Sequence, residues 1–338
     1  MIISTSSPEF PHFPVMLDEV IKICEPEKGG VFLDCTFGSG GYSNKILNFS
    51  KTKVIAIDRD KFIDKFEKKL KQKYPERFFF HFKRFSELKK VIGSQLVDVV
   101  LFDLGLSSIQ LNDLQRGFSF KSKESLDMSM GLTNISAEEV VNNSDEIKLR
   151  SIIKILGEEK DASRIAKNII ISRAKKRITK VNQLVEIIKK SKRKYNNKIN
   201  PCTKTFQAIR IFVNKEISEL IKGIINATQA LKPGGKILVV SFHSIEDKII
   251  KYFFTRYSSN RSKPSRYLPE NVENNISLFN PYRNKIYTPT NLEITQNPPS
   301  RSAKLRYAIR NENKFIYPDE LIKKFKKYID LESYNAKI

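Results

Sequence analysis

Four short apolar runs in the first third of the chain constrain its fold more than any other feature. They cover residues 31–33, 53–57, 78–82 and 97–102. Three of the runs end directly before an aspartate, at Asp34, Asp58 and Asp103. Because the runs are mostly apolar rather than alternating, they are typical of strands buried on both faces of a parallel sheet. Helix-like stretches separate them, so the pattern predicts βαβ units and an open α/β sheet.

The regular alternation stops after the fourth run. A fifth run, residues 236–242, follows Asp103 only after some 130 residues, behind a Pro-Gly-Gly turn. The intervening segment has helical spacing of its isoleucines and leucines, and Ser136 with Glu139 forms a capping-box pattern. We therefore expect a discontinuous sheet domain, residues 1–111 and 200–314, with an inserted helical domain at 112–199. Residues 257–301 read as a long loop, 303–309 as a last strand and 315–338 as a helical tail.

The charge is strongly unbalanced, at +24 with a pI near 9.8. This excess predicts a polyanionic partner, although a general richness in Lys, Ile and Asn is an alternative source of it. Thirteen basic residues lie between positions 164 and 198, where Glu186 is the only acid. A merely solvated face would normally mix signs, so the inserted domain is the best candidate for a nucleic-acid surface.

Other classes of protein are disfavoured. The three cysteines and three histidines are scattered, which disfavours a disulfide framework and a metal-ligand cluster, so we expect no metal. The first residues lack a basic stretch followed by an apolar one, and no apolar run approaches the roughly 18 residues of a membrane span. We expect a cytoplasmic protein with no membrane partner. The sequence does not indicate an oligomeric state.

A glycine turn follows the first run, in Asp34-Cys-Thr-Phe-Gly38-Ser-Gly40-Gly41. Such glycines let the backbone approach a ligand and turn into the next helix. Asp58 closes the second run, where a carboxylate can accept both hydroxyls of an adenosine ribose. Together they favour a nucleoside cofactor, either NAD or S-adenosylmethionine, and the incomplete G-x-G-x-x-G pattern slightly disfavours NAD. A plain structural turn is the alternative.

A second candidate site follows the fourth run, in Asp103-Leu-Gly105-Leu-Ser107-Ser108-Ile-Gln110. Ligands of open α/β sheets bind at the carboxyl ends of strands, although a simple strand-end turn is the alternative. An acceptor here would suit methylation of an exocyclic amine, whose lone pair is delocalised into its ring. Acceptors on the N–H groups draw such a nitrogen toward tetrahedral geometry and help to remove a proton, while the rest of the gain is orientation. We expect Asp103 to be catalytic.

Ten blocks of sequence resemble one known family in the same order. They are HFPVMLDEV, LDCTFGSGGYS, AIDRD, DLGLSSIQL, QRGFSF, LDMSM, GEEKDASRIAK, TKTFQAIRIFVNKE, LKPGGKILVVSFHSIEDKIIK and NPPSRSAKLR. On these blocks the chain resembles the bacterial ribosomal RNA small subunit methyltransferase H family almost end to end. The resemblance implies a Rossmann-like class I methyltransferase sheet of seven strands with an inserted helical domain. It also implies S-adenosylmethionine-dependent N4-methylation of a specific cytidine in the decoding (P-site) region of 16S rRNA, within the small ribosomal subunit.

The resemblance also assigns site residues. It implies that Asp58 holds the cofactor ribose, that Phe85 lies near the adenine, and that the remaining cofactor contacts are Gly40, Gly41, Tyr42, Asp103 and Gln110. The family usually has His where this chain has Tyr42, so a main-chain contact carries over and an imidazole role does not. Ile109 replaces the usual Pro, and Asn200 the usual His.

Several further residues have two readings. His243, Glu246 and Asp247 would touch the target base or would form a capped, salt-linked turn with Ser244. Arg116, Phe118 and Phe120 would grip RNA or pack the domain junction. Asp127 would have a similar role or would simply close the pocket. Two rival functions also stay open from the residues alone, a nicotinamide oxidoreductase and a non-catalytic RNA-binding assembly factor.

Overall fold

The computed structural model describes residues 14–193, 200–259 and 277–333. The chain forms two compact units. Unit 1 comprises Met1–Gly105 with Leu220–Lys324, and unit 2 comprises Leu106–Glu219 with Phe325–Ile338. The domain bounds predicted from the sequence refer to functional parts of the chain rather than to these compact units, and they stay a prediction.

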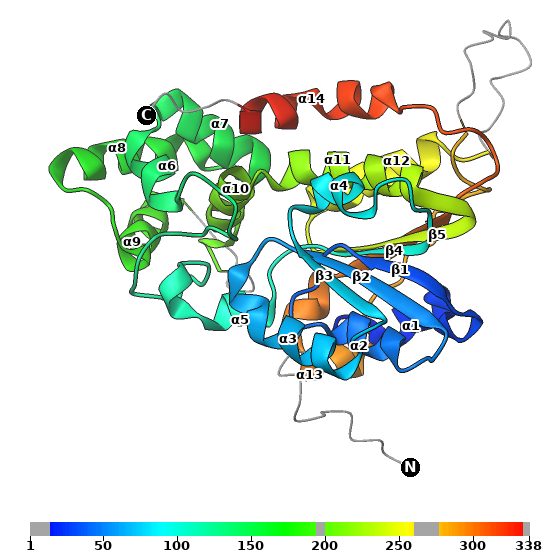
Figure 1. The fold of residues 1–338 in the computed structure, drawn as a ribbon. Helices are drawn as coiled ribbons and strands as arrows, with labels where there is room; N and C mark the ends of the chain where they lie inside the picture. Colours follow the sequence, from blue (N-terminus) through cyan, green and yellow to red (C-terminus); the bar gives the residue numbers. More distant parts are fainter. Residues whose placement is uncertain (1–13, 194–199, 260–276, 334–338) are drawn as a thin grey trace, which may run out of the picture. The chain divides into compact units, whose positions relative to one another are not determined.

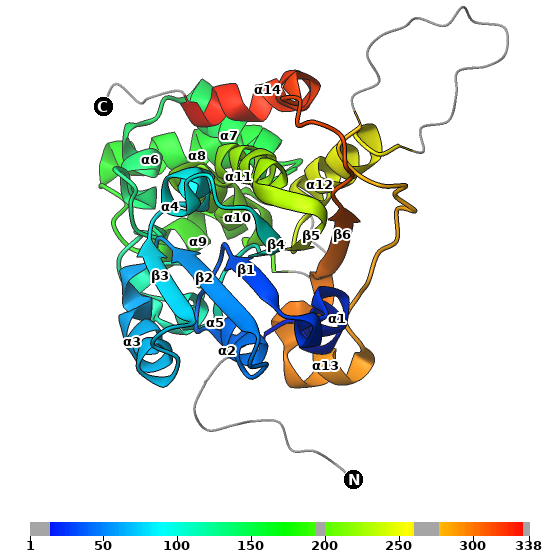
Figure 2. The same cartoon turned by 45° about the vertical axis from the view of Figure 1, so that its right-hand side comes forward.

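Unit 1 is built on one mixed sheet. Its strands are β1 (Gly30–Asp34), β2 (Thr52–Asp58), β3 (Phe78–Phe82), β4 (Val97–Asp103), β5 (Leu231–Ser241) and β6 (Lys304–Ile309). They lie in the order β3-β2-β1-β4-β5-β6, and only the β5–β6 pairing is antiparallel (Figure 2). The predicted α/β class is confirmed, and each predicted run lies on a strand. The resemblance implied seven strands, whereas the sheet has six in the described residues.

Helices cover both faces of this sheet (Figures 1 and 2). One face carries α4 (Leu88–Ile92), α11 (Glu216–Ala230) and α12 (Ser244–Arg256). The other carries α1 (Leu17–Cys24), α2 (Gly41–Leu47), α3 (Asp64–Lys73) and α13 (Asn291–Gln296). Central strand residues such as Phe32, Val54 and Val100 are therefore fully buried, which explains why their runs are mostly apolar.

Unit 2 is helical, as the sequence predicted for the long gap between the fourth and fifth runs. It contains α5 (Ser108–Asn112), α6 (Ala137–Asn143), α7 (Glu146–Leu156), α8 (Ala162–Lys175), α9 (Val181–Ser191), α10 (Thr203–Asn214) and the end of α14 (Asp319–Ser333). The predicted capping box of Ser136 and Glu139 begins α6. Ile165 and Ile169 of α8 and Leu184 and Ile188 of α9 are buried in its core.

Short 3₁₀ turns complete the chain. They are η1 (Pro26–Lys28), η2 (Lys61–Ile63), η3 (Phe85–Glu87), η4 (Leu114–Arg116) and η5 (Pro298–Ser302). The expectation of a featureless loop at 257–301 was wrong for its second half, which contains α13 and η5. Thr290 caps α13 by accepting the Glu293 N–H at 3.1 Å, a local bond that a loop reading overlooks.

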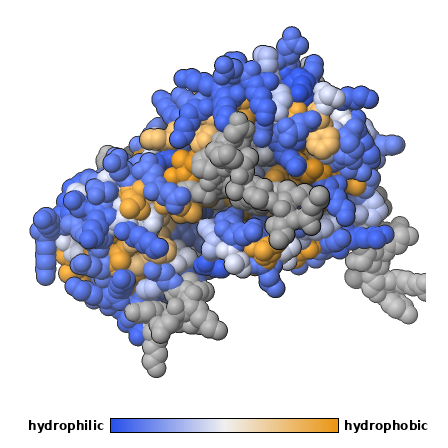
Figure 3. Space-filling model, turned by 90° about the horizontal axis from the view of Figure 1, so that it is seen from below, coloured by the Kyte–Doolittle hydropathy of each residue, from blue (hydrophilic) through white to orange (hydrophobic). Residues whose placement is uncertain are grey.

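Hydrophilic side chains dominate the face drawn in Figure 3, and no helix in the described part of the chain suits a membrane span.

Glu332 of α14 closes the amino end of α11 within unit 2. Its two carboxylate oxygens accept the N–H groups of Ile217 at 3.0 Å and Ser218 at 2.7 Å. These first-turn donors have no partner inside their own helix. Glu332 is only 2% exposed, and burial raises the pKa of its carboxyl to about 7 despite the three hydrogen bonds it accepts.

This burial predicts a pH-dependent loss of stability. Because the pKa is raised above its ordinary value of 4.5, the native state holds a proton that the unfolded state releases. The protein therefore loses stability as the pH rises from the pKa of Glu332 in the unfolded state through its pKa in the folded state. The E332Q variant lacks this titration, so between pH 5 and 8 wild-type stability should fall by up to about 3 kcal/mol more than that of the variant. Urea unfolding of both proteins measures this difference, and parallel pH curves would contradict it.

Candidate active site

Three carboxylates lie along one edge of the unit 1 sheet. Asp34, Asp58 and Asp103 are the last residues of β1, β2 and β4, which are neighbours in the sheet. The strand order reverses between β1 and β4, since one connection runs outward to β2 and the other to β5. Ligands of open α/β sheets bind in the crevice at such a reversal.

Asp34 and Asp58 hold the glycine turn from two sides. Asp34 accepts the Ser43 hydroxyl at 2.6 Å and the Thr36 N–H at 3.2 Å. Asp58 accepts the N–H groups of Gly38 at 2.8 Å and Asp60 at 2.9 Å. Burial raises the pKa of Asp34 to about 6, and it also raises the pKa of Asp58. Ionisation of the two carboxyls that hold the turn is therefore costly unless a cation lies nearby.

Asp103 is the least satisfied of the three carboxylates. Its N–H donates to Thr36 Oγ1 at 2.7 Å, which ties the end of β4 to the glycine turn. Its Oδ1 is shielded from solvent and has no hydrogen-bond partner in the described part of the chain. Burial, and then the negative charges of Asp34, Glu246 and Glu293, hold the pKa of Asp103 well above its usual range. An unpaired buried acceptor costs about 1–3 kcal/mol, so the site is suited to a ligand that donates an N–H or brings positive charge.

The glycines of the turn pack tightly against neighbouring side chains. Gly40 has a φ of +81°, and a Cβ there would lie 2.8 Å from the ring of Phe37. A Cβ on Gly41 would lie 2.2 Å from Cγ of Pro14. Neither position has room for a side chain. Tyr42, the next residue, is buried and its hydroxyl donates to the carbonyl of Val15, so only its main chain is left for a ligand.

Phe85 and Gln110 lie in different units. Phe85 begins η3 in unit 1, and its half-buried ring meets Phe102 edge-on with centroids 5.4 Å apart. A Cβ on Gly223 would lie 2.6 Å from this ring, so a glycine is what admits it. Gln110 belongs to unit 2, where it forms a capping box with Ser107 at the start of α5. Unit 1 thus contains every predicted cofactor residue except Gln110.

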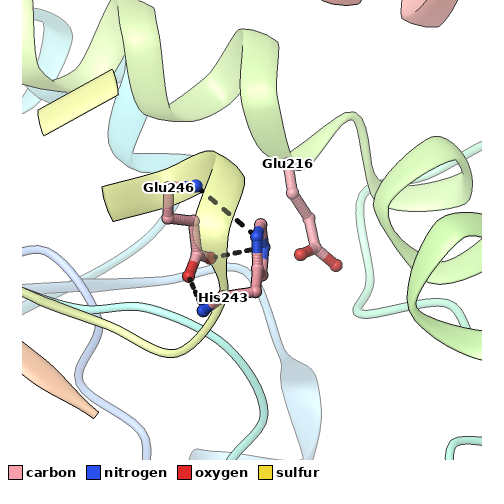
Figure 4. Close-up of side chains that lie close together, drawn as sticks. All are labelled: Glu216, His243 and Glu246. Atoms are coloured by element: carbon pink, nitrogen blue, oxygen red, sulfur yellow. Dashed lines mark hydrogen bonds and ion pairs between the residues drawn. The ribbon is translucent and has the colours of Figure 1, made fainter. Parts of the chain in front are cut away.

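His243 and Glu246 form a helix cap (Figure 4). Nδ1 of His243 accepts the Glu246 N–H at 3.5 Å, and the Glu246 carboxylate accepts the His243 N–H at 3.3 Å. The structural reading therefore holds, with His243 rather than Ser244 as the capping residue. Asp247 binds Arg306 at 2.7 Å and Lys304 at 3.0 Å. Burial opposes ionisation of Asp247, but these two cations outweigh it and lower its pKa.

The QRGFSF and LDMSM segments pack within unit 2. Arg116 donates to the carbonyl of Ser129 at 2.9 Å and lies 5.2 Å from the buried ring of Phe118. Phe120 meets a ring of α10 edge-on at 6.3 Å. Asp127 accepts the Ser129 hydroxyl at 2.8 Å. These contacts lie within unit 2, so the choice between RNA binding and packing at the domain junction stays a prediction.

Two residues near Asp103 were not assigned a role from the sequence. Asp34 stands inside the glycine motif, and its position directly after a buried run was the signal that could have identified it. Glu293 accepts the Met16 N–H at 2.8 Å, and burial raises its pKa. Glu293 lies 190 residues beyond Asp103 in a segment read as loop, so nothing local in the sequence indicated it.

Known proteins match most of the chain. The profile of the MraW methylase family matches residues 9–311. A relative from Ehrlichia canis (strain Jake) named "Ribosomal RNA small subunit methyltransferase H" is 44% identical over 304 residues, which is 88% of this chain and 99% of the relative. Relatives of the same name from Ehrlichia ruminantium (strain Gardel) and Rickettsia akari (strain Hartford) are 42% identical over 88% of this chain, and over 99% and 97% of their own lengths. With these matches over almost the whole sheet and its helical insertion, the chain belongs to the MraW methylase family.

Proposed function

We propose that this chain transfers a methyl group from S-adenosylmethionine to N4 of a specific cytidine in the decoding region of 16S rRNA. The observation that carries the proposal is the unpaired, buried Oδ1 of Asp103 at the strand-order reversal. The names of the relatives support small-subunit rRNA as the substrate. A substrate within the small ribosomal subunit places the activity in the cytoplasm.

The residues of unit 1 suit the cofactor. A Cβ would not fit at Gly40 or Gly41, so the turn that would approach the cofactor requires glycine at both positions. Asp58 uses one lone pair on each oxygen for an N–H, and a carboxylate has about four, so two ribose hydroxyls can still be accepted. We assign Phe85, Tyr42 and Gln110 to the remaining contacts on the family resemblance. When bound, S-adenosylmethionine supplies an activated methyl group on a positively charged sulfonium.

Asp103 is assigned the catalytic role. Its Oδ1 would accept an N–H of the cytosine amine, which concentrates the lone pair on the nitrogen and orients it. Burial strengthens this hydrogen bond, since fewer water molecules compete for the acceptor. The raised pKa of Asp103 also makes its carboxylate a stronger acceptor for the departing amine proton.

Labelled cofactor separates this proposal from its two rivals. Purified protein is incubated with methyl-labelled S-adenosylmethionine and either naked 16S RNA or small subunits, both taken from cells that lack this protein. We expect label in the RNA of at least one preparation and no dependence on NAD. A non-catalytic assembly factor would leave both RNAs unlabelled, and a nicotinamide oxidoreductase would bind NAD in calorimetry instead.

The D58A variant tests the ribose contact. Loss of hydrogen bonds to a charged group costs about 1.5–3 kcal/mol, so the Kd for S-adenosylmethionine should rise roughly 10- to 150-fold. Isothermal titration calorimetry measures this change. The matched control is D64A, because Asp64 is an exposed acid at the start of α3. Unchanged cofactor binding in a folded D58A protein would contradict the assignment.

A further inference from the structure

A groove lies along the outer edge of β6 in unit 1. The chain segment 278–287 forms two bridges here, one between Tyr287 and Leu305 of β6 and one between Phe279 and Arg310, the residue directly after β6. Between these bridges the segment and the strand enclose a groove of about 300 Å³. Its walls include Tyr282, Arg283, Lys285, Tyr287 and Tyr307.

The groove combines aromatic rings with cations. Tyr287 and Tyr307 lie with their ring centroids 6.2 Å apart at an angle of 44°, and both side chains are half-buried. Arg283 and Lys285 are exposed, and the Lys285 ammonium lies 4.5 Å from the ring centroid of Tyr287. None of the described residues that line the groove is acidic. Rings that stack on bases beside cations that bind phosphates are the two elements of a single-stranded nucleic-acid groove.

A buried arginine holds one wall of the groove in place. Arg306 is 1% exposed and is bound to Asp247 at 2.7 Å. It also donates to the Tyr282 hydroxyl at 3.1 Å and to Asn284 Oδ1 at 2.7 Å. The residue between these two partners is Arg283. Because the wall is fixed before a ligand arrives, less entropy is lost on binding.

One end of the groove is level with the proposed methyl-transfer centre. Asp103 is paired with Val240 across β4 and β5, and Val240 is paired with Leu305 across β5 and β6. Leu305, the bridge partner of Tyr287, is thus level with Asp103 in the sheet. Two strand spacings, about 10 Å, separate them. From this level the groove runs along β6 to Ile309, whose partner Lys236 is paired with Val99, so it would hold nucleotides that lead away from a target base at Asp103.

We propose that this groove binds single-stranded RNA beside the target cytidine, with Tyr287 and Tyr307 stacking on bases and Arg283 and Lys285 contacting phosphates. The proposal rests on the proposed function, since it gives the RNA substrate a second contact. An acidic peptide would satisfy the cations but would have no flat ring for the tyrosines, so RNA is the better occupant.

Fluorescence anisotropy of the full chain with a short labelled oligouridine tests the stacking. The Y287L and Y307L variants should each weaken binding about 5- to 150-fold, while the salt dependence stays as in wild type. Y287F and Y307F retain the rings and should bind like wild type, which separates stacking from loss of fold. Y317L is the matched control, because Tyr317 is exposed and does not line the groove.

The charges are tested in the same assay. The R283Q/K285Q double variant should flatten the log–log salt dependence by about 1.4, or 0.7 for each phosphate that is no longer neutralised. Wild-type oligouridine affinity in both leucine variants would overturn the proposal. A labelled polyglutamate peptide serves as the second probe. If the leucine variants lost binding to this peptide but not to oligouridine, the proposal would also be overturned, because the groove would then be a peptide site. Methyl transfer by the wild type is measured separately. If the wild type methylates RNA but the leucine variants bind oligouridine as wild type does, only the groove is rejected. If the leucine variants bind oligouridine more weakly but the wild type methylates no RNA, only the enzymatic function is rejected.

Discussion

Replacing Asp103 with asparagine is expected to lower the single-turnover rate of methyl transfer by about 10²- to 10⁴-fold. Asparagine keeps the shape of the side chain but is a weaker acceptor and cannot take up the amine proton. The fold should not suffer, because the raised pKa of Asp103 means that its ionised form is disfavoured by its surroundings. A neutral amide removes that cost, so stability at pH 8 should be equal to or above that of wild type.

Rapid-quench kinetics with labelled cofactor and thermal unfolding check the two parts of this prediction. The control is D98N, on the opposite end of the same strand, where Asp98 binds Lys232 at 2.8 Å and the Val31 N–H at 2.8 Å. D98N should change stability but not the rate of the folded enzyme. A wild-type rate in D103N would exclude Asp103 from the chemistry.

Neutralising four lysines of unit 2 is expected to have the second-largest effect. Within the basic stretch 164–198, charge alone would select the cluster Arg173, Lys175, Lys176 and Arg177 as an RNA-binding set. The structure corrects that choice, since Arg173 donates to the carbonyls of Val141 and Ser144 at 2.8 and 2.6 Å. Arg177 is paired with an acid of α6 at 2.8 Å. Removing these arginines would disturb the fold as well as the charge.

The better set consists of exposed lysines at the carboxyl ends of α8 and α9: Lys175, Lys176, Lys189 and Lys190. If each lysine contacts one phosphate, the slope of log affinity against log salt should be shallower by about 3 in the quadruple glutamine variant. Its RNA affinity at 0.1 M salt should be roughly several hundred-fold lower. Cofactor affinity should not change. Lys194 and Lys198, which belong to the same basic stretch, lie outside the described residues.

A charge-matched control distinguishes a specific surface from general attraction. Changing the exposed α3 lysines Lys65, Lys68, Lys71 and Lys73 to glutamine removes the same charge from unit 1. RNA binding with small-subunit RNA is measured from about 50 to 200 mM salt, the range over which phosphate contacts are most visible. If both quadruple variants keep the wild-type slope, the basic helices of unit 2 are only a solvated surface, and the β6 groove becomes the main RNA contact.

The sheet and its acidic edge were predictable because their causes are local. A strand covered by helices on both faces must be apolar along most of its length, so residues 53–57 and 97–102 were recognisable without any long-range information. Asp58 and Asp103 were found because a charge directly after such a run lies at the carboxyl edge of the sheet. The Pro-Gly-Gly turn was recognised, but it lies inside β5, where the register with β4 shifts after Val97.

The contacts that the sequence could not give are all long-range. Glu293 reaches Met16 across 277 residues, and Glu332 reaches Ile217 across 115 residues. No periodicity or local motif encodes such pairings, and a buried acid resembles an exposed one in the sequence. The same limit applies to the basic stretch, where charge counting could not separate the structural Arg173 from the exposed Lys175.

The position of the methyl group is the most direct test of the account. Small-subunit RNA from cells lacking this protein is treated with wild-type enzyme and S-adenosylmethionine, digested to nucleosides and analysed by mass spectrometry. An acceptor at Asp103 that binds an exocyclic amine predicts N4-methylcytidine, formed by wild type and strongly reduced in D103N. A methyl group on a ribose oxygen or a ring carbon, or equal N4-methylcytidine from both proteins, would contradict the account.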